Sequence, residues 1–305
     1  MGLRWVSKGT TIVGTPPAEV SLTVDWVRSL LQSQHPDLAD LPLQLAASGY
    51  DNAMFRLGDR WAVRMPRRKL GAVLIEKEQT WLPLLSPQLT LPVPQPVRLG
   101  LPGSGYPWRW SVVPWMQGQT ADLAPLNAGE AERLAAFLRS LHTPAPDNAP
   151  FSPHRGVPLA SRSEHVTQWM SALAQSSNLI TPAIKKLWQR ACRAPAAADR
   201  FWLHGDLHPH NVLVAAGRLS GVIDWGDLTA GDVATDLATI WMLFDSQGAR
   251  QQAIKAYGAD DGLVLRAQGW AVFFATILLK NGLVDNPSHA AIGRNTLRRL
   301  AEDSS

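Results

Sequence analysis

One segment in the second half of the chain constrains its fold more than any other feature. Residues 204–214 read H-G-D-L-H-P-H-N-V-L-V, and residues 222–227 read V-I-D-W-G-D. A carboxylate, Asp206, stands on a tight loop, with an amide, Asn211, five residues later and an apolar strand after it. A second carboxylate, Asp224, ends the next apolar strand. The pattern predicts a β-hairpin that carries acidic and amide groups.

This set of groups is the one that phosphoryl transfer requires. One carboxylate receives the proton of the acceptor hydroxyl, while an amide and a second carboxylate hold magnesium on the nucleotide phosphates. Protein kinases carry H-R-D-x-x-x-x-N and D-F-G for these tasks, and here the motifs read H-G-D-x-x-x-x-N and D-W-G. We predict that Asp206 is the catalytic base and that Asn211 and Asp224 bind Mg²⁺ in a small-molecule kinase.

Length and composition fit a two-lobed cytoplasmic enzyme. The chain has 305 residues, and its longest apolar runs, such as Trp270 to Leu279, are too short to span a membrane. The N-terminus lacks the apolar core of a signal peptide, and the lone Cys192 is compatible with a reducing compartment. The net charge is +4, but only short basic runs stand out, so we expect neither a nucleic-acid nor a membrane partner.

Acidic residues concentrate around the motif although the chain is basic overall. The segment from His204 to Asp245 contains six Asp and no Glu, against one basic residue, Arg218. Acids gathered in this way are suited to bind cations. Metal ions meet that description, and so does a cationic small-molecule substrate.

The N-terminal half carries the pattern of a nucleotide-binding lobe. Such a lobe needs a glycine-bearing turn over the phosphates, a cation on the next strand, and an acid on the following helix that holds the cation. We predict strands over 43–47, 53–57, 61–65 and 108–115. We also predict a helix over residues 71–85, whose inner face should consist of Val73, Leu74, Trp81, Leu82 and Leu85.

Candidate nucleotide-binding residues follow from that order. The turn between the first two strands contains three of them, Ser48, Gly49 and Asn52. Arg64 occupies the strand position where kinases usually carry Lys, and Glu78 or Glu76 on the helix can pair with it. Arg is longer and planar, so it can clamp a phosphate but will not occupy the same point as Lys.

As a group, these motifs resemble those of the aminoglycoside phosphotransferase family, bacterial small-molecule kinases with a protein-kinase-like fold. The similarity spans about residues 43–243 and continues beyond the two motifs into A-G-D-V-A-T-D-L-A over 230–238. It implies ATP and Mg²⁺ as cofactors and Asp232 as a support of the catalytic loop. His204 is expected to be a structural hydrogen-bonding residue, and Asp236 a cap or brace.

The resemblance also implies an α+β, two-lobed fold, with a small N-terminal lobe around an antiparallel sheet and a larger, mainly helical C-terminal lobe. We divide the chain into a nucleotide-binding lobe, 1–117, with a loose leader over 1–17, and a catalytic and substrate-binding lobe, 118–305. The linker beginning at Val113 would contact the adenine through its backbone, and Trp115 would flank the pocket. Further helices are expected over 22–31, 128–142, 162–174, 182–192, 233–244, 263–283 and 289–300.

The acceptor does not follow from the family, which covers aminoglycoside, macrolide, choline, homoserine and methylthioribose kinases. An aminoglycoside-type antibiotic is our first hypothesis. The alternative is a kinase of a sugar, an amino alcohol or a macrolide, and a nucleotide-binding pseudokinase is a third hypothesis. Three histidines in the motif also suggest a zinc cluster, but zinc motifs usually add Cys or carboxylate ligands at helical or hairpin spacing. These histidines are His204, His208 and His210.

Overall fold

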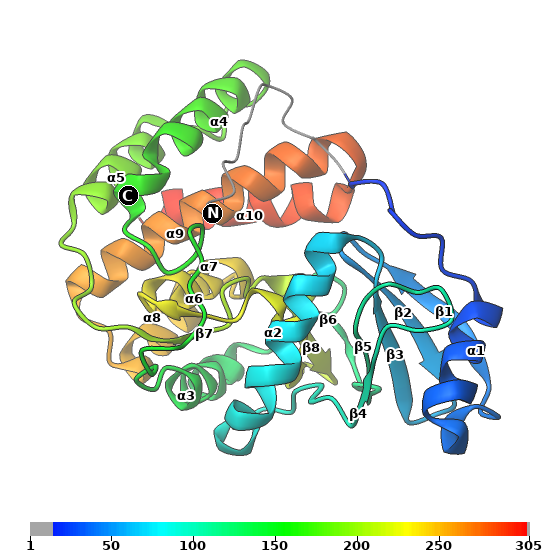
Figure 1. Ribbon diagram of the computed structural model, residues 1–305. Helices are drawn as coiled ribbons and strands as arrows, with labels where there is room; N and C mark the ends of the chain where they lie inside the picture. The colour runs from blue at the N-terminus through cyan, green and yellow to red at the C-terminus, as the bar shows by residue number, and fades with distance from the viewer. Residues whose placement is uncertain (1–14, 304–305) are drawn as a thin grey trace.

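A five-stranded antiparallel sheet forms the N-terminal part of the chain, as seen in a computed structural model that describes residues 15–303 (Figure 1). The spatial order is β1-β2-β3-β5-β4. Of the expected leader, residues 1–14 lie outside the described residues. The short β4 was not predicted, because three residues carry no readable alternation. The strands are β1 (Leu43–Ser48), β2 (Asn52–Leu57), β3 (Trp61–Pro66), β4 (Arg98–Gly100) and β5 (Trp110–Pro114).

Two helices lie on opposite sides of this sheet (Figure 1). The outer helix, α1 (Val24–Gln34), begins at Thr23, whose side chain caps the NH of Trp26, and packs its apolar stripe against the sheet. The inner helix, α2 (Lys69–Leu85), contacts the turn that contains Gly226 and contributes Leu82 to the core of the C-terminal part. Because α2 contacts both parts, its side chains can link the sheet to the catalytic motif.

The C-terminal part is mainly helical. The helix predicted over 233–244 is divided into α6 and α7, and α8 was not predicted. Only Ala249, Arg250 and Ala253 of α8 are buried, so the helix has no wide apolar stripe by which the sequence could reveal it. The sequence marks this helix only by its capping residues, Ser246 and Gly258. The helices are α3 (Ala131–Leu141), α4 (Ser163–Ser176), α5 (Pro182–Arg193), α6 (Ala234–Leu237), α7 (Thr239–Leu243), α8 (Gln247–Tyr257), α9 (Asp261–Asp285) and α10 (Pro287–Glu302).

The long helix α9 is the central helix of this part. Among the helices of residues 15–303, it alone is long and apolar enough to cross a membrane by composition, but 61% of its apolar window is buried inside the protein. Trp270, Phe273 and Phe274 on α9 are buried in the larger core, which also includes residues of α3, α5 and α10. Its apolar composition is therefore that of a core helix.

Short strands carry the motif residues. The hairpin predicted around residues 202–224 is present as β8 (Val212–Ala215) and β9 (Arg218–Val222), and β6 (Gln119–Thr120) pairs with β8. The strand before the motif, β7 (Phe201–Leu203), pairs with β10 (Thr229–Gly231). The loop with Asp206 thus lies between β7 and β8, and Asp224 follows β9. The lobe boundary between residues 117 and 118 stays a prediction.

Candidate active site

The loop that carries Asp206 is held by the fully buried His204. Nδ1 of His204 accepts the backbone NH of Asp206 at 3.2 Å, and Nε2 lies 3.0 Å from the carbonyl oxygen of Ile223. In a neutral imidazole, Nε2 can donate to that carbonyl while Nδ1 accepts. His204 therefore ties the catalytic loop to the residue before Asp224, which supports the structural role expected for it.

Asn211 and Gly205 bring the two motif loops together. Nδ2 of Asn211 donates to the carbonyl of Asp206 at 2.8 Å, and the carbonyl of Asn211 accepts the NH of Ile223 at 2.9 Å. Gly205 has φ +85°, and a Cβ there would lie 2.5 Å from the carbonyl oxygen of Asp227. Both the left-handed backbone and this close approach require glycine. The H-G-D and D-W-G motifs are therefore in direct contact.

The carboxylate that supports the catalytic loop is Asp236, whereas the sequence indicated Asp232 for this role. Asp236 is buried and accepts the backbone NH of His204 at 2.7 Å and of Gly205 at 2.9 Å. Asp232 instead pairs with Arg266 of α9 at 2.7 Å. Asp232 precedes α6 and reaches Arg266 of α9, whereas Asp236 lies within α6 and reaches the loop. Asp236 is thus the brace that the sequence allowed as an alternative to a cap.

Arg64 of β3 joins the helix acid to the D-W-G carboxylate. Its guanidinium lies 3.2 Å from Glu78 and 2.5 Å from Asp224. Arg64 and Glu78 are buried, whereas Glu76 is 58% exposed and faces Arg109, so Glu78 is the acid that pairs. Burial raises the pKa of Glu78 to about 7, although the charge of Arg64 opposes the rise.

The predicted magnesium ligands have the chemistry that Mg²⁺ prefers. The side chain of Asp224 is 54% exposed, and its backbone adopts a left-handed conformation with φ 61°, which Asp tolerates better than most residues. Asn211 uses Nδ2 to hold the loop, which leaves its amide oxygen for metal coordination. A carboxylate and an amide oxygen are hard ligands suited to Mg²⁺. Residue types and positions therefore fit a magnesium ion.

The turn expected over the phosphates joins β1 to β2. The NH of Gly49 donates to the carbonyl of Asn52 at 2.9 Å, and Arg67 donates to the carbonyl of Gly49 at 2.7 Å. Ser48 pairs with Ala53 at the end of the ladder. A Cβ on Gly49 would come no closer than 3.7 Å to a neighbour, so the folded turn itself does not require glycine. A close approach of phosphate would be a separate reason for this glycine.

The linker residues Val113 and Trp115 lie at the end of β5. Val113 pairs with Ala62 on β3, two residues before Arg64. The NH of Trp115 donates to the carbonyl of Arg60 at 2.8 Å, and Arg56 covers the indole ring at 4.2 Å. That NH is therefore already used inside the protein. An adenine contact through the linker would need other backbone groups.

Two basic residues contact Asp206, and the sequence did not reveal either role. Arg155 lies 3.0 Å from Oδ1, and Nε2 of His208 lies 3.3 Å from Oδ2. Burial opposes ionisation, but the charges of His208 and Arg155 hold the pKa of Asp206 below its ordinary value. Arg155 lies on the loop between α3 and α4, 51 residues before Asp206, so no local motif signals the contact.

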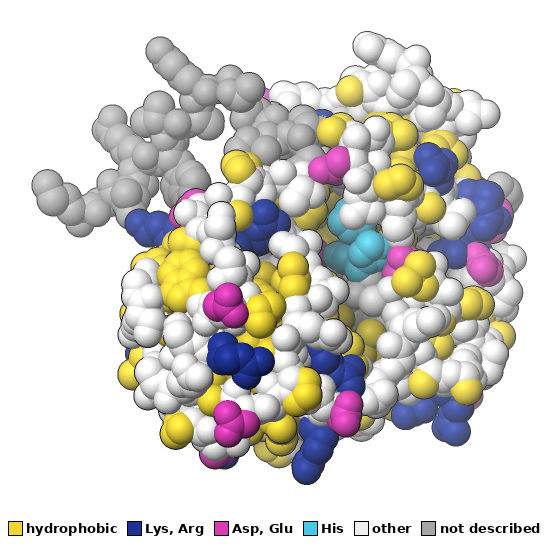
Figure 2. Space-filling model, turned by 90° about the vertical axis from the view of Figure 1, so that its right-hand side faces the viewer, with side chains coloured by type: hydrophobic (Ala, Val, Ile, Leu, Met, Phe, Trp, Pro, Cys, Tyr) yellow, Lys and Arg dark blue, Asp and Glu magenta, His cyan; other side chains and the backbone are white. Residues whose placement is uncertain are grey.

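Histidine side chains gather in a depression on one face of the molecule (Figure 2). His208, His210 and His289 contact one another through their rings, and His210 lies 3.1 Å from Asp122. Burial and the charges of the other two histidines lower the pKa of His289 to about 4. The zinc hypothesis is wrong, because His204 points to Ile223 and no metal-binding group of three or more ligand side chains exists among residues 15–303.

The acidic segment around the motif does not form an open acidic surface. Burial, followed by the charge of Asp206, raises the pKa of Asp227. Less of the acidic charge is left for a cationic substrate than composition suggested, because the other aspartates accept contacts from arginine or from backbone NH groups. These are Asp206, Asp224, Asp232, Asp236 and Asp245.

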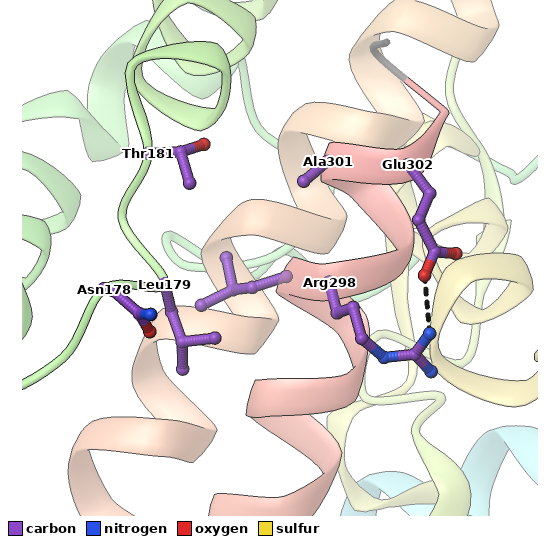
Figure 3. A pocket seen from close by; sticks show the side chains of 7 residues that line it. Asn178, Leu179, Thr181, Arg298, Ala301 and Glu302 are labelled. Carbon is purple, nitrogen blue, oxygen red and sulfur yellow. Dashed lines mark hydrogen bonds and ion pairs between the residues drawn. The ribbon is translucent and has the colours of Figure 1, made fainter.

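A hollow of about 380 Å³ lies between the loop before α5 and the end of α10 (Figure 3). It contains none of the predicted site residues, and an ion pair between Arg298 and Glu302 crosses its α10 side. The carboxylate of its lining, Glu302, is paired with Arg298. The candidate active site is therefore the motif region and not this hollow. The hollow is lined by Asn178, Leu179, Thr181, Leu297, Arg298, Ala301 and Glu302.

The chain is similar to curated enzymes over part of its length. An aminoglycoside 3'-phosphotransferase from Escherichia coli is 27% identical over 144 residues, which cover 44% of this chain and 52% of that protein. A thiamine kinase from Salmonella paratyphi A is 25% identical over 170 residues, which cover 49% of each chain. The chain thus matches these curated relatives over about half of their length.

The fold itself matches solved structures more completely. The GDP complex of aminoglycoside 2'-phosphotransferase-IIIa aligns with a TM-score of 0.66 and 19% identity, over 93% of this chain and 99% of that one. This confirms the kinase-like α+β fold with an antiparallel N-terminal sheet and a helical C-terminal part. The profile of the Phosphotransferase enzyme family matches residues 42–272, which include the Arg64 strand, the H-G-D loop and the D-W-G turn. With the profile spanning most of its length, the chain belongs to the phosphotransferase enzyme family.

Proposed function

We propose that the protein transfers the γ-phosphoryl group of ATP to a hydroxyl group of a small molecule. The strongest support is that strand β3, helix α2 and the H-G-D loop all meet at the D-W-G turn. Arg64 and Glu78 from the N-terminal part meet Asp224, while Asn211 and Gly205 hold the H-G-D loop against the same turn. A pseudokinase would not need a loop with both a base and an intact pair of metal ligands.

Each residue has one task in this proposal. Asp206 orients the acceptor hydroxyl and takes its proton as the oxygen bonds to the γ-phosphorus, while the bond to the β,γ-bridging oxygen breaks and ADP leaves. Asn211 and Asp224 would hold Mg²⁺, which neutralises charge on the phosphates when bound. Ser48, Gly49 and Asn52 would cover the phosphates, and the Val113–Trp115 linker would border the adenine.

Two classes of acceptor substrate are candidates. Relatives named aminoglycoside phosphotransferase and thiamine kinase make a cationic acceptor one candidate. The contacts of Arg155 and His208 with Asp206 favour the other candidate, a small-metabolite kinase whose acceptor is not cationic, because they bring positive charge to the base. A cationic antibiotic would meet repulsion there.

The test is ADP release by purified protein across a panel of acceptors. We expect Mg²⁺-dependent release that one acceptor class stimulates and that EDTA abolishes. The panel should include aminoglycosides, macrolides, thiamine, sugars and amino alcohols. No stimulation by any aminoglycoside would exclude the antibiotic candidate but leave the kinase proposal standing. Absence of any MgATP binding by calorimetry would contradict the kinase proposal itself.

Arg64 gives a prediction on nucleotide binding. We expect Arg64→Ala to weaken MgATP binding roughly ten- to hundredfold, because a charged hydrogen-bonding group is lost and Glu78 is left buried without its cation. Arg64→Lys should be partly tolerated, since Lys is the usual kinase residue. Calorimetry on both variants measures this, with Arg98→Ala, an exposed arginine of β4, as the matched control. Unchanged binding and turnover in Arg64→Ala would refute the assignment.

A further inference from the structure

A group of basic side chains adjoins Asp206, and we call Arg155, Arg162 and His154 the basic cluster. Arg155 contacts Asp206 at 3.0 Å, and Arg162 donates to Nδ1 of His154 at 3.3 Å. The guanidinium groups of Arg155 and Arg162 lie 5.4 Å and 5.7 Å from the same aromatic ring, that of Phe273. The ring thus lies near two cations, one of which, Arg155, contacts Asp206.

The positive charge of the basic cluster is not matched by acids within the described residues. Arg155 has one carboxylate partner, Asp206, and no ion pair from residues 15–303 reaches Arg162. Nε of Arg155 and Nε of Arg162 are both buried, and neither has a hydrogen-bond partner in this part of the chain. Buried donors without partners are rare in folded proteins, and each calls for an explanation.

The electrostatic surroundings point in the same direction. Burial lowers the pKa of Arg162, and the charge of Arg155 lowers it further. Burial also lowers the pKa of His154, with Arg162, Arg155 and His165 adding to the effect. Both groups therefore have like charges as neighbours, which costs free energy unless an anion joins them.

A purely structural role explains only part of this arrangement. Stacking on Phe273 would account for one long side chain that covers an aromatic ring. It does not account for a second arginine near the same ring, nor for the two Nε groups without a hydrogen-bond partner among residues 15–303. Two guanidinium groups near the same ring can instead bind one carboxylate or phosphate together.

We propose that the acceptor substrate carries an oxyanion, a carboxylate or a phosphate monoester, which binds Arg155 and Arg162 beside Asp206. This inference rests on the proposed kinase function and specifies its acceptor. Because Arg155 contacts Asp206 in the structure, an anion that shares Arg155 would leave more of the carboxylate free for the acceptor hydroxyl. The same charges would disfavour polycationic acceptors such as aminoglycosides.

The test is direct binding of inorganic phosphate and of acetate, measured by calorimetry with and without saturating MgADP at constant ionic strength. We expect Arg162→Gln to weaken binding of the preferred anion roughly ten- to hundredfold, because one charged hydrogen-bonding partner is lost. Arg162→Lys keeps the positive charge and should weaken anion binding less, which separates the loss of charge from misfolding. Arg190→Gln, an exposed arginine of α5, is the matched control and should bind like the parent.

The outcomes distinguish a phosphate from a carboxylate on the acceptor. They also distinguish failure of this inference from failure of the proposed kinase function. Preference for phosphate would indicate a phosphorylated acceptor, and preference for acetate a carboxylate-bearing one. If the parent bound neither anion, or Arg162→Gln bound both as the parent does, the inference would be overturned even with normal MgADP binding. With an acceptor found by ADP release, Arg162→Gln should raise KM more than it lowers kcat. A cationic acceptor with unchanged KM would also overturn the inference.

Discussion

Replacing Asp206 by Asn is expected to lower turnover roughly a hundred- to ten-thousandfold while MgATP binding stays close to that of the parent. The amide keeps the shape of the side chain but cannot take the proton of the acceptor hydroxyl. The loss corresponds to about 3 to 5 kcal/mol of activation barrier. Asp206 contacts Arg155 and His208, so its neutralisation leaves net positive charge nearby, which does not oppose an anionic nucleotide.

ADP release and calorimetry on the same preparation measure both quantities, with the acceptor that the panel identifies. The matched control is Asp245→Asn, a carboxylate of the same segment whose side chain is 75% exposed and pairs with Arg299. It should behave like the parent. If Asp206→Asn turned over as fast as the parent, the assignment of the catalytic loop would fail.

The β8–β9 hairpin and the first three strands could be predicted because their signals are local. In β2, Ala53, Phe55 and Leu57 alternate with partly buried residues, as in a strand with one face on the core. The H-G-D and D-W-G motifs lie in adjacent segments, and hairpin pairing brings them together with little help from the rest of the chain.

The face of α2 was predicted only in part. Val73 was expected inside but is 56% exposed, whereas Ile75, Glu78 and Leu82 lie on the buried stripe. The spacing of these three positions is helical, so the register that buries Ile75 and Leu82 also buries Glu78 and exposes Glu76. The prediction placed only apolar side chains on the inner face, whereas the buried stripe also contains Glu78, which pairs with Arg64.

The surroundings of Asp206 could not be read from the sequence. Arg155 reaches Asp206 from a distant loop, and the ring of Phe273 on α9 holds it there. Such contacts depend on how α9 packs against the rest of the helical part, which no local spacing encodes. The choice between Asp232 and Asp236 likewise depends on tertiary contacts, because Asp236 accepts the NH of His204 while Asp232 pairs with Arg266 of α9. The number of aspartates near the motif therefore suggested a cationic ligand, although in the folded chain most of them contact arginine side chains or backbone NH groups.

Replacing Asp224 should affect both turnover and metal-dependent nucleotide binding. We expect Asp224→Ala to lose Mg²⁺-dependent turnover by at least about a thousandfold, because a metal stabilises transition-state charge by several kcal/mol. Alanine also introduces strain, since the φ of 61° costs an ordinary residue about 1 to 2 kcal/mol. Asp224→Asn tolerates that backbone and keeps the shape, so it isolates the loss of charge.

The measurement is MgATP binding and ADP release as functions of Mg²⁺ concentration, with thermal unfolding as the check on folding and Asp245→Ala as the matched control. Asp224→Asn should need more Mg²⁺ for the same binding, because one anionic ligand is lost while Arg64 keeps its pair with Glu78. A parent-like Mg²⁺ dependence would contradict the metal assignment. Because Asp206→Asn should keep the Mg²⁺ dependence of the parent and Asp224→Asn should shift it to higher Mg²⁺ concentration, the two variants assign the base and the metal ligand independently.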